Sequence, residues 1–123
     1  MSLLLDTHVL LWWLTDSDRL TPAMRTAITG ADAAVSAASV WEASIKASLG
    51  KLDMPDDLLQ EMRQQGFAEL PVTAADGLAA GCLPRHHDDP FDRLLVAQAQ
   101  RRDLLLVTAD RRLSEYDVRT LLP

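Results

Sequence analysis

Long hydrophobic runs, a basic N-terminus and multiple cysteines are all missing from this sequence of 123 residues. No apolar stretch approaches the roughly 20 residues that a membrane-spanning helix needs, and the N-terminus lacks the basic region of a secretory signal peptide. The single cysteine, Cys82, excludes an intrachain disulfide and suits a reducing compartment. We therefore expect a cytoplasmic protein that makes no contact with a membrane.

Positive charge is also scarce, because 12 Lys and Arg residues face 18 Asp and Glu residues and give a net charge of −6. This balance argues against a generic nucleic-acid-binding protein, although a metal ion held by converging carboxylates would offset their charge locally. Seven of the twelve basic residues come late in the chain: Arg85, Arg93, Arg101, Arg102, Arg111, Arg112 and Arg119. They indicate either a basic rim beside an acidic pocket, which would suit a phosphodiester substrate, or a scatter of solvated arginines.

Predicted strands and helices alternate along the whole chain. Short apolar runs predict strands at residues 3–5, 33–36, 67–72, 104–107 and 118–122. Helices are expected at about residues 7–14, 22–30, 37–49, 55–66, 74–82 and 90–100. This alternation predicts an α/β fold with a mostly parallel central sheet of about four to five strands and helices on both faces. With 48% hydrophobic residues, residues 1–123 are expected to form a single domain.

The segment from Asp89 to Asp110 is predicted to be a helix followed by a buried strand. Asp89 has the position of a helix N-cap, and Pro90 has that of the first helical residue. The strand at residues 104–107 is continuously apolar, which is typical of a strand covered on both faces. Thr108 and Asp110 follow it, at the end of the strand where ligand-binding groups collect in α/β sheets.

Asp6 and Asp110 occupy similar positions, because each follows an apolar, strand-like run. The carboxyl ends of parallel strands lie on the same edge of a sheet, so neighbouring strands would bring the two carboxylates together. The alternative for each residue is a helix N-cap, since a helix is expected after both. For the pair, a shared functional site is somewhat favoured.

Glu42 lies within a predicted helix and shares a side of it with Ile45 and Leu49. A carboxylate on an apolar helix side needs a partner, because burying an unpaired charge is costly. Two local explanations are available: a capping box with Ser39, and an ion pair with Lys46 one turn later. Without further context, these explanations are narrowly favoured over a functional one.

Asp92 lies in the first turn of the helix that begins at Pro90, on a side shared with Val96 and Ala99. The local pattern also fits a capping box with Asp89. The sequence around Asp92 therefore leaves its role open, whereas Asp89 fits the capping role better than a catalytic one.

The acidic residues matter more as a set than singly. Three or four carboxylates, without a histidine or cysteine set of metal-ligand spacing, indicate a hard cation such as Mg²⁺ or Mn²⁺ rather than Zn²⁺. Such a site activates water and stabilises charge on a phosphoryl group. Thr108 would orient a carboxylate or the attacking water, or it would simply end a strand as a β-branched residue.

Other conspicuous residues are interpreted structurally. His86 and His87 are assigned to a loop that leads into the helix cap, because adjacent histidines on a loop do not converge easily and His8 is the only other histidine. The tryptophans are expected in the core or in an interface: Trp12, Trp13 and Trp41. Cys82 falls on an apolar helix side and is expected in the core.

Four segments of the chain resemble the PIN-domain ribonucleases, specifically the VapC-type toxins of bacterial toxin–antitoxin pairs. The segments are LLLDTHVLLWW, SAASVWEASIKASLGKL, HHDDPFDRLLVAQAQ and LLLVTADRRLSEY. Each is weak evidence alone, but together and in this order they are highly specific and span nearly the whole chain. The acidic positions of the family match Asp6, Glu42, Asp92 and Asp110, and its hydroxyl residue before the last acid matches Thr108.

The resemblance implies a PIN-like three-layer α/β/α fold and an endoribonuclease that depends on Mg²⁺ or Mn²⁺. Family members cut RNA, often structured RNA such as tRNA. The resemblance also implies a homodimer and a small cognate antitoxin of the VapB type that inserts near the active site. Arg93, Arg111 and Arg112 are candidates for contacts with the RNA backbone.

In the mechanism that this predicts, the four carboxylates hold one or two metal ions and a metal-activated hydroxide attacks phosphorus in line. Two rival hypotheses remain. The acidic cleft could bind a basic partner without catalysis, such as an arginine-rich antitoxin tail. A receiver-like or aspartyl-phosphate domain also gathers acids at strand ends, but the phosphatases expect a second aspartate where this chain has His8.

Overall fold

A five-stranded, fully parallel sheet lies at the centre of the computed structural model, which describes residues 2–123. The strands are β1 (Leu3–Leu5), β2 (Ala33–Ser36), β3 (Ala68–Leu70), β4 (Leu105–Val107) and β5 (Thr120–Leu121). Their order across the sheet is β3-β2-β1-β4-β5, and every neighbouring pair is parallel. The strand count and direction agree with the sequence-based prediction.

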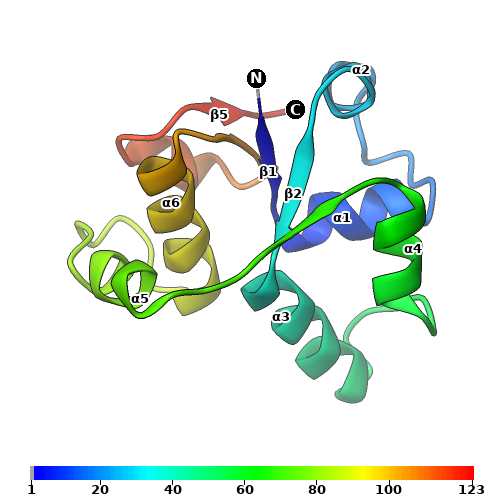
Figure 1. Cartoon of the computed structure of the whole chain (residues 1–123), viewed down its shortest axis with the longest axis horizontal. Helices are drawn as coiled ribbons and strands as arrows, with labels where there is room; N and C mark the ends of the chain where they lie inside the picture. Colours follow the sequence, from blue (N-terminus) through cyan, green and yellow to red (C-terminus); the bar gives the residue numbers. More distant parts are fainter. Residues whose placement is uncertain (1) are drawn as a thin grey trace.

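Helices connect the strands and cover both faces of the sheet (Figure 1). In residues 2–123 they are α1 (Thr7–Leu14), α2 (Pro22–Thr29), α3 (Ala37–Ser48), α4 (Leu58–Gln64), α5 (Ala74–Gly81), α6 (Pro90–Arg102) and the 3₁₀ helix η1 (Arg111–Glu115). Helices α1, α2 and α4 lie on one side of β1 and β2, and α5 and α6 lie on the other. The predicted α/β/α layering is confirmed.

The strand order reverses direction between β1 and β4. From β1 the chain moves outward to β2 and β3, and it then crosses back to place β4 on the other side of β1. The connections on the two sides of this point leave the sheet in opposite directions, so a crevice opens outside the carboxyl ends of β1 and β4. Ligands of open α/β sheets bind at such a switch point.

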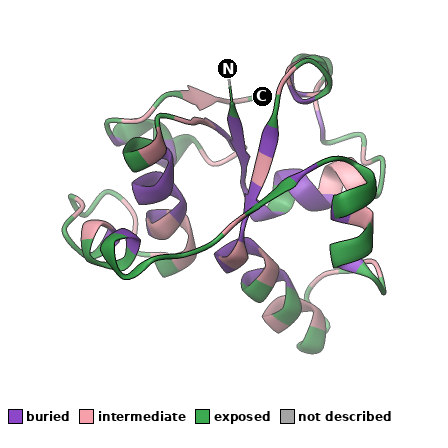
Figure 2. Ribbon diagram, viewed as in Figure 1, coloured by how far each residue is buried: buried purple, intermediate pink, exposed green. Residues whose placement is uncertain are grey.

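Buried side chains fill both faces of the sheet, with β1 contributing to each. Leu3 and Leu5 belong to one buried cluster and Leu4 to the other, because successive side chains of a strand point to opposite faces. Figure 2 shows these central strands as buried, whereas the outer faces of the helices are exposed. A strand covered on both sides explains why the run of leucines is continuous rather than alternating.

The structure departs from the sequence-based prediction mainly at element ends. Helix α4 begins at Leu58 rather than at Pro55, because Asp57 is its N-cap and accepts a hydrogen bond from the backbone N–H of Gln60. The edge strands β3 and β5 are shorter than the apolar runs at residues 67–72 and 118–122 suggested. No helix within residues 2–123 is long and apolar enough to cross a membrane.

Two residues assigned to apolar surroundings lie at the surface. Cys82 is the C-cap of α5 and is exposed, so its expected place in the core is wrong. Trp41 is 65% exposed and packs only its edge against the ring of Phe91, with ring centroids 5.4 Å apart. Trp41 is therefore not a core residue, and its expected alternative place, an interface, stays a prediction.

Candidate active site

The carboxyl ends of β1 and β4 meet at Asp6 and Thr108. Leu5 pairs with Val107 in the parallel register, so the residues that follow the two strands are neighbours. The Thr108 hydroxyl donates a hydrogen bond of 2.5 Å to Oδ2 of Asp6. The other carboxylate oxygen of Asp6 accepts a 2.8 Å bond from the N–H of Val9 and caps α1. Asp6 is thus both a helix cap and a buried carboxylate, because its two oxygens serve different partners.

Asp110 is tied to the same point through Thr108. Its backbone N–H donates to the Thr108 hydroxyl at 3.1 Å, which fixes the turn between β4 and η1. Its carboxylate caps η1 and receives two further bonds from the guanidinium of Arg112, at 2.9 and 3.1 Å. These bonds to Arg112 lower the pKa of the Asp110 carboxyl below its usual value.

Glu42 reaches the site from α3 and is 3% exposed. The N-cap of α3 is Ser36, whose hydroxyl accepts a hydrogen bond from the N–H of Ala38, so the capping box expected at Ser39 is wrong. The Thr7 hydroxyl donates to Oε1 of Glu42 at 2.5 Å, and Nζ of Lys46 donates to Oε2 at 2.8 Å. The expected ion pair with Lys46 therefore exists, and the same carboxylate also faces the cavity.

Of the two neighbouring acids, Asp89 caps helix α6 and Asp92 places its carboxylate in the site. Asp89 caps α6 by accepting from the N–H groups of Phe91 and Asp92, at 2.8 and 3.2 Å. The Asp92 carboxylate instead faces Nε2 of His87, 2.8 Å away. The same nitrogen lies 3.3 Å from Oδ2 of Asp110. Through His87, Asp92 and Asp110 are brought to one place.

A cavity of about 330 Å³ is lined by all of these acids. Its carboxylates are Asp6, Glu42, Asp89, Asp92 and Asp110. Its basic side chains are His8, Lys46, His87 and Arg112. The four acids singled out from the sequence thus share one cavity at the switch point of the sheet. Thr108 does not line the cavity, but its hydrogen bond holds the Asp6 carboxylate in position.

Crowding of the acids shifts their pKa values. Burial raises the pKa of Asp6 to about 6 and outweighs the lowering effect of the hydrogen bonds from Thr108 and Val9, while the charges of Glu42 and Asp110 raise it by smaller amounts. Burial and then the charge of Asp89 raise the pKa of Asp92 to about 6. The negative charge of one carboxylate in this cavity therefore disfavours ionisation of its neighbours. Clusters of carboxyl groups with raised pKa values are typical of functional sites.

The donor set fits a divalent cation. The ligand atoms of His87, Asp92 and Asp110 all lie within 4.8 Å of one another, and Asp6 and Glu42 bring further oxygens to the same cavity. A cation of charge +2 would compensate for the burial and the repulsion that raise the pKa values of Asp6 and Asp92.

His87 was missed by the sequence analysis. Its side chain is 8% exposed and points into the cavity, whereas the adjacent His86 lies outside it and makes an edge-to-face contact with Tyr116, with ring centroids 4.9 Å apart. Neighbouring loop residues can take opposite directions, so the adjacency of the two histidines did not argue against a ligand. The only sequence signal was that His87 precedes Asp92 by five residues, but such a separation across a loop does not determine whether two side chains meet.

Arg93 does not serve as a contact for RNA, contrary to the expectation from the sequence. It is 7% exposed, and its guanidinium donates hydrogen bonds to four backbone carbonyls: those of Ala80, Leu83, Pro84 and His87. Its charge is committed to holding the loop between α5 and α6. Arg112 lines the cavity, where it is paired with Asp110, and Arg111 is exposed, so a contact with RNA stays a prediction for these two residues.

Comparison with known proteins decides the family. The PIN domain description matches residues 3–119. The chain belongs to the PIN-domain family. It is 34% identical over 119 residues to Ribonuclease VapC22 of Mycobacterium tuberculosis (strain ATCC 25618 / H37Rv), covering 94% of this chain and 92% of that protein. The resemblance to VapC-type proteins is therefore confirmed.

Solved structures show the same fold for this PIN domain at low sequence identity. VapBC2 from Rickettsia felis, bound to a DNA fragment from its promoter, matches with a TM-score of 0.72 and 13% identity, covering 100% of this chain and 99% of that one. FitAcB from Neisseria gonorrhoeae matches with a TM-score of 0.65 and 22% identity, covering 98% and 96%. At these identities the likeness concerns the fold alone.

Proposed function

We propose that this PIN domain, residues 1–123 acting as one domain, is a VapC-type toxin that hydrolyses RNA phosphodiester bonds as an endoribonuclease. The observation that carries the proposal is the cavity at the switch point, where Asp6, Glu42, Asp92 and Asp110 converge. The 34% identity to a ribonuclease over most of both chains supports the reaction class.

The four carboxylates are the residues that would hold Mg²⁺ or Mn²⁺, directly or through waters. When bound, the ion supplies a water of lowered pKa and positive charge beside the scissile phosphate. The protein groups around the carboxylates keep them in place. Thr108 orients Asp6, and Lys46 pairs with Glu42, which raises the pKa of the Lys46 ammonium. No protein nucleophile is required.

A second hollow continues from the acidic cavity and offers a path for an RNA strand. It has a volume of about 370 Å³ and shares His8 and Trp12 with the cavity. Arg19 and Lys51 line it, and within residues 2–123 neither side chain makes an ion pair. Exposed cations beside an acidic, metal-binding cavity are suited to the phosphates that flank a cleavage site.

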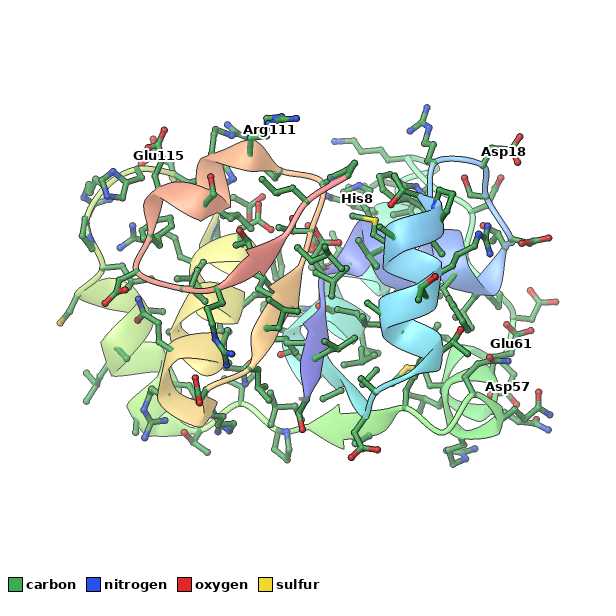
Figure 3. All side chains as sticks on the ribbon, turned by 90° about the horizontal axis from the view of Figure 1, so that it is seen from above. His8, Asp18, Asp57, Glu61, Arg111 and Glu115 are labelled. Atoms are coloured by element: carbon green, nitrogen blue, oxygen red, sulfur yellow. The ribbon has the colours of Figure 1, made fainter. Side chains whose placement is uncertain are left out.

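Arg111 is a further exposed cation, next in the sequence to Asp110 and Arg112, which line the cavity. Figure 3 shows His8 and Arg111 on one side of the molecule, away from Asp57 and Glu61. Arg19 and Lys51 line the second hollow and Arg112 lines the acidic cavity, so basic side chains lie next to the proposed site although the net charge of the chain is −6. Structured RNA such as tRNA is the substrate class that we expect.

The expected protein partners are a VapB-type antitoxin and a second copy of the chain in the cytoplasm. The resemblance to VapC-type proteins supports the first expectation. The acidic cavity suits a basic antitoxin side chain, which would compete with the metal ion for the same carboxylates. For the homodimer, Leu78 and Trp41 offer large apolar side chains at the surface, 76% and 65% exposed.

The test is cleavage of RNA by the purified protein, with RNA ends sequenced after incubation. We expect cleavage with Mg²⁺ or Mn²⁺, none in EDTA, and a loss of at least about a hundredfold in Asp92→Asn, since even residues that only support a metal ligand cost 10–100-fold. Asp88→Asn is the matched control, because its side chain is 92% exposed and lies outside the cavity. Full activity in a well-folded Asp92→Asn protein would contradict the proposal.

The same assay separates the rival hypothesis of a non-catalytic cleft. A protein that only binds a basic partner would bind an arginine-rich peptide but leave RNA intact under every metal condition. Cleavage that survives both EDTA and Asp6→Asn would come from a contaminating nuclease.

A further inference from the structure

His87 is the imidazole that contacts the acids of the cavity within residues 2–123. Its Nε2 atom lies 2.8 Å from Oδ2 of Asp92 and 3.3 Å from Oδ2 of Asp110. The side chain is 8% exposed, so little solvent separates the ring from these carboxylates. A histidine in this position is unexpected in a site otherwise built from oxygen donors.

The backbone of the loop fixes His87 independently of its side chain. The carbonyl of His87 accepts hydrogen bonds from Nη1 of Arg93 and from the hydroxyl of Tyr116, both at 3.3 Å. Both donors are buried, and Arg93 binds three further carbonyls of the segment from Ala80 to Pro84. The ring is therefore directed into the cavity by an anchored backbone, and a substitution of the side chain leaves the anchor intact.

The distances around Nε2 match those between donors to one ion. For ligands about 2.1 Å from a metal in octahedral geometry, adjacent donor atoms lie about 3 Å apart. The two separations around Nε2, 2.8 and 3.3 Å, lie on either side of this value, and the ligand oxygens of Asp92 and Asp110 lie within 4.8 Å of each other. The three donor atoms can therefore bind one cation with little movement of the side chains.

We propose that His87 is a nitrogen ligand of the divalent cation in this site, with Asp92 and Asp110, and that it makes the site prefer Mn²⁺ to Mg²⁺. The inference rests on the proposed function for the presence of the ion. Binding uses the lone pair of Nε2, and the neutral ring carries its proton on Nδ1. Imidazole favours first-row transition metals, whereas Mg²⁺ demands oxygen ligands and gives up water reluctantly.

The alternative role of His87 is to hold Asp92 in place by a hydrogen bond without touching the ion. The variant His87→Gln distinguishes the two roles, because the glutamine amide can keep a hydrogen bond to Asp92 but supplies no imidazole nitrogen. His86→Gln is the matched control, since His86 is the adjacent histidine and its ring lies outside the cavity.

The experiment measures Mn²⁺ binding directly in the absence of RNA. Electron spin-echo envelope modulation on the Mn²⁺-loaded wild-type protein is expected to show ¹⁴N coupling from a bound imidazole, and His86→Gln is expected to keep it. In His87→Gln this coupling disappears. Titration calorimetry is expected to show Mn²⁺ affinity falling by at least about tenfold in His87→Gln, while Mg²⁺ affinity changes by less than about threefold.

Two results would overturn the inference, and they differ in what else they affect. Mn²⁺ that binds the wild-type protein without ¹⁴N coupling would refute nitrogen ligation but leave the carboxylate site and the proposed function standing. Failure of the wild-type protein to bind either Mn²⁺ or Mg²⁺ would refute both the role of His87 and the metal-dependent mechanism.

Discussion

Replacing Asp6 by asparagine is expected to stabilise the metal-free protein at neutral and higher pH. Asp6 is 5% exposed, and its carboxyl pKa is raised from 3.8 to about 6 by burial and by neighbouring acids. The fold therefore favours the protonated carboxyl, and this stabilisation is lost as the pH rises through about 6. A shift of about two pKa units corresponds to about 3 kcal/mol of the free energy of unfolding, at about 1.4 kcal/mol a unit.

Asparagine can replace the protonated carboxyl in this place. Its Oδ1 can still accept from the N–H of Val9 and cap α1, and its amide can donate to the hydroxyl of Thr108. In EDTA we expect Asp6→Asn and the wild-type protein to have similar free energies of unfolding at pH 4. At pH 8 the variant is expected to be more stable by about 3 kcal/mol.

The assay is chemical denaturation in EDTA at pH values from 4 to 8, followed by circular dichroism. Asp88→Asn is the control, because it removes the same charge from a side chain that is 92% exposed. A stability difference between Asp6→Asn and the wild type that does not change with pH would refute the reasoning, because it would mean that folding does not raise the pKa of the Asp6 carboxyl. Saturating Mn²⁺ is expected to reverse the order, because only the carboxylate can hold the ion.

Two further predictions concern the basic residues. The double variant Arg19→Ser, Lys51→Ser is expected to raise KM for RNA and to make KM less dependent on salt concentration, with kcat nearly unchanged. The reason is that it removes contacts to phosphates that lie away from the reacting atoms. A loss of kcat instead would show that these residues take part in the cleavage step. Arg93→Ala is expected to lower the free energy of unfolding by roughly 3 kcal/mol, because buried carbonyls lose a charged donor. Arg63→Ala on the exposed side of α4 is the control for charge, and equal effects in denaturation of these two variants would contradict the anchoring role of Arg93.

Much of the site could be predicted from the sequence where an acid follows a strand directly. Asp6 comes immediately after the buried leucines of β1, and Thr108 comes immediately after β4, so the parallel sheet alone determines that they meet. Their local alternative was helix capping, and the structure shows that Asp6 and Asp110 do cap helices. Capping and site-building are compatible for these residues, because a carboxylate has two oxygens and several lone pairs.

The contribution of His87 could not be predicted, because long-range hydrogen bonds decide it. The path of the loop depends on Arg93 and Tyr116, which bind the carbonyl of His87 from elsewhere in the fold. The arginine itself lies next to Asp92 in a motif that suggested a contact with RNA. Its burial depends on the carbonyls that the turn after α5 presents to it, and no pattern within one segment reveals such an arrangement.

The pairing of β1 with β4 also determines when the site can form during protein synthesis. The hydrogen bond between Thr108 and Asp6 spans 102 positions of the chain. A growing chain carries Asp6 and Glu42 long before β4 exists, yet its central sheet lacks the neighbour that closes the cavity. A partly synthesised toxin is therefore expected to be harmless to the RNA around the ribosome, and activity begins only when the late strand docks beside the first one.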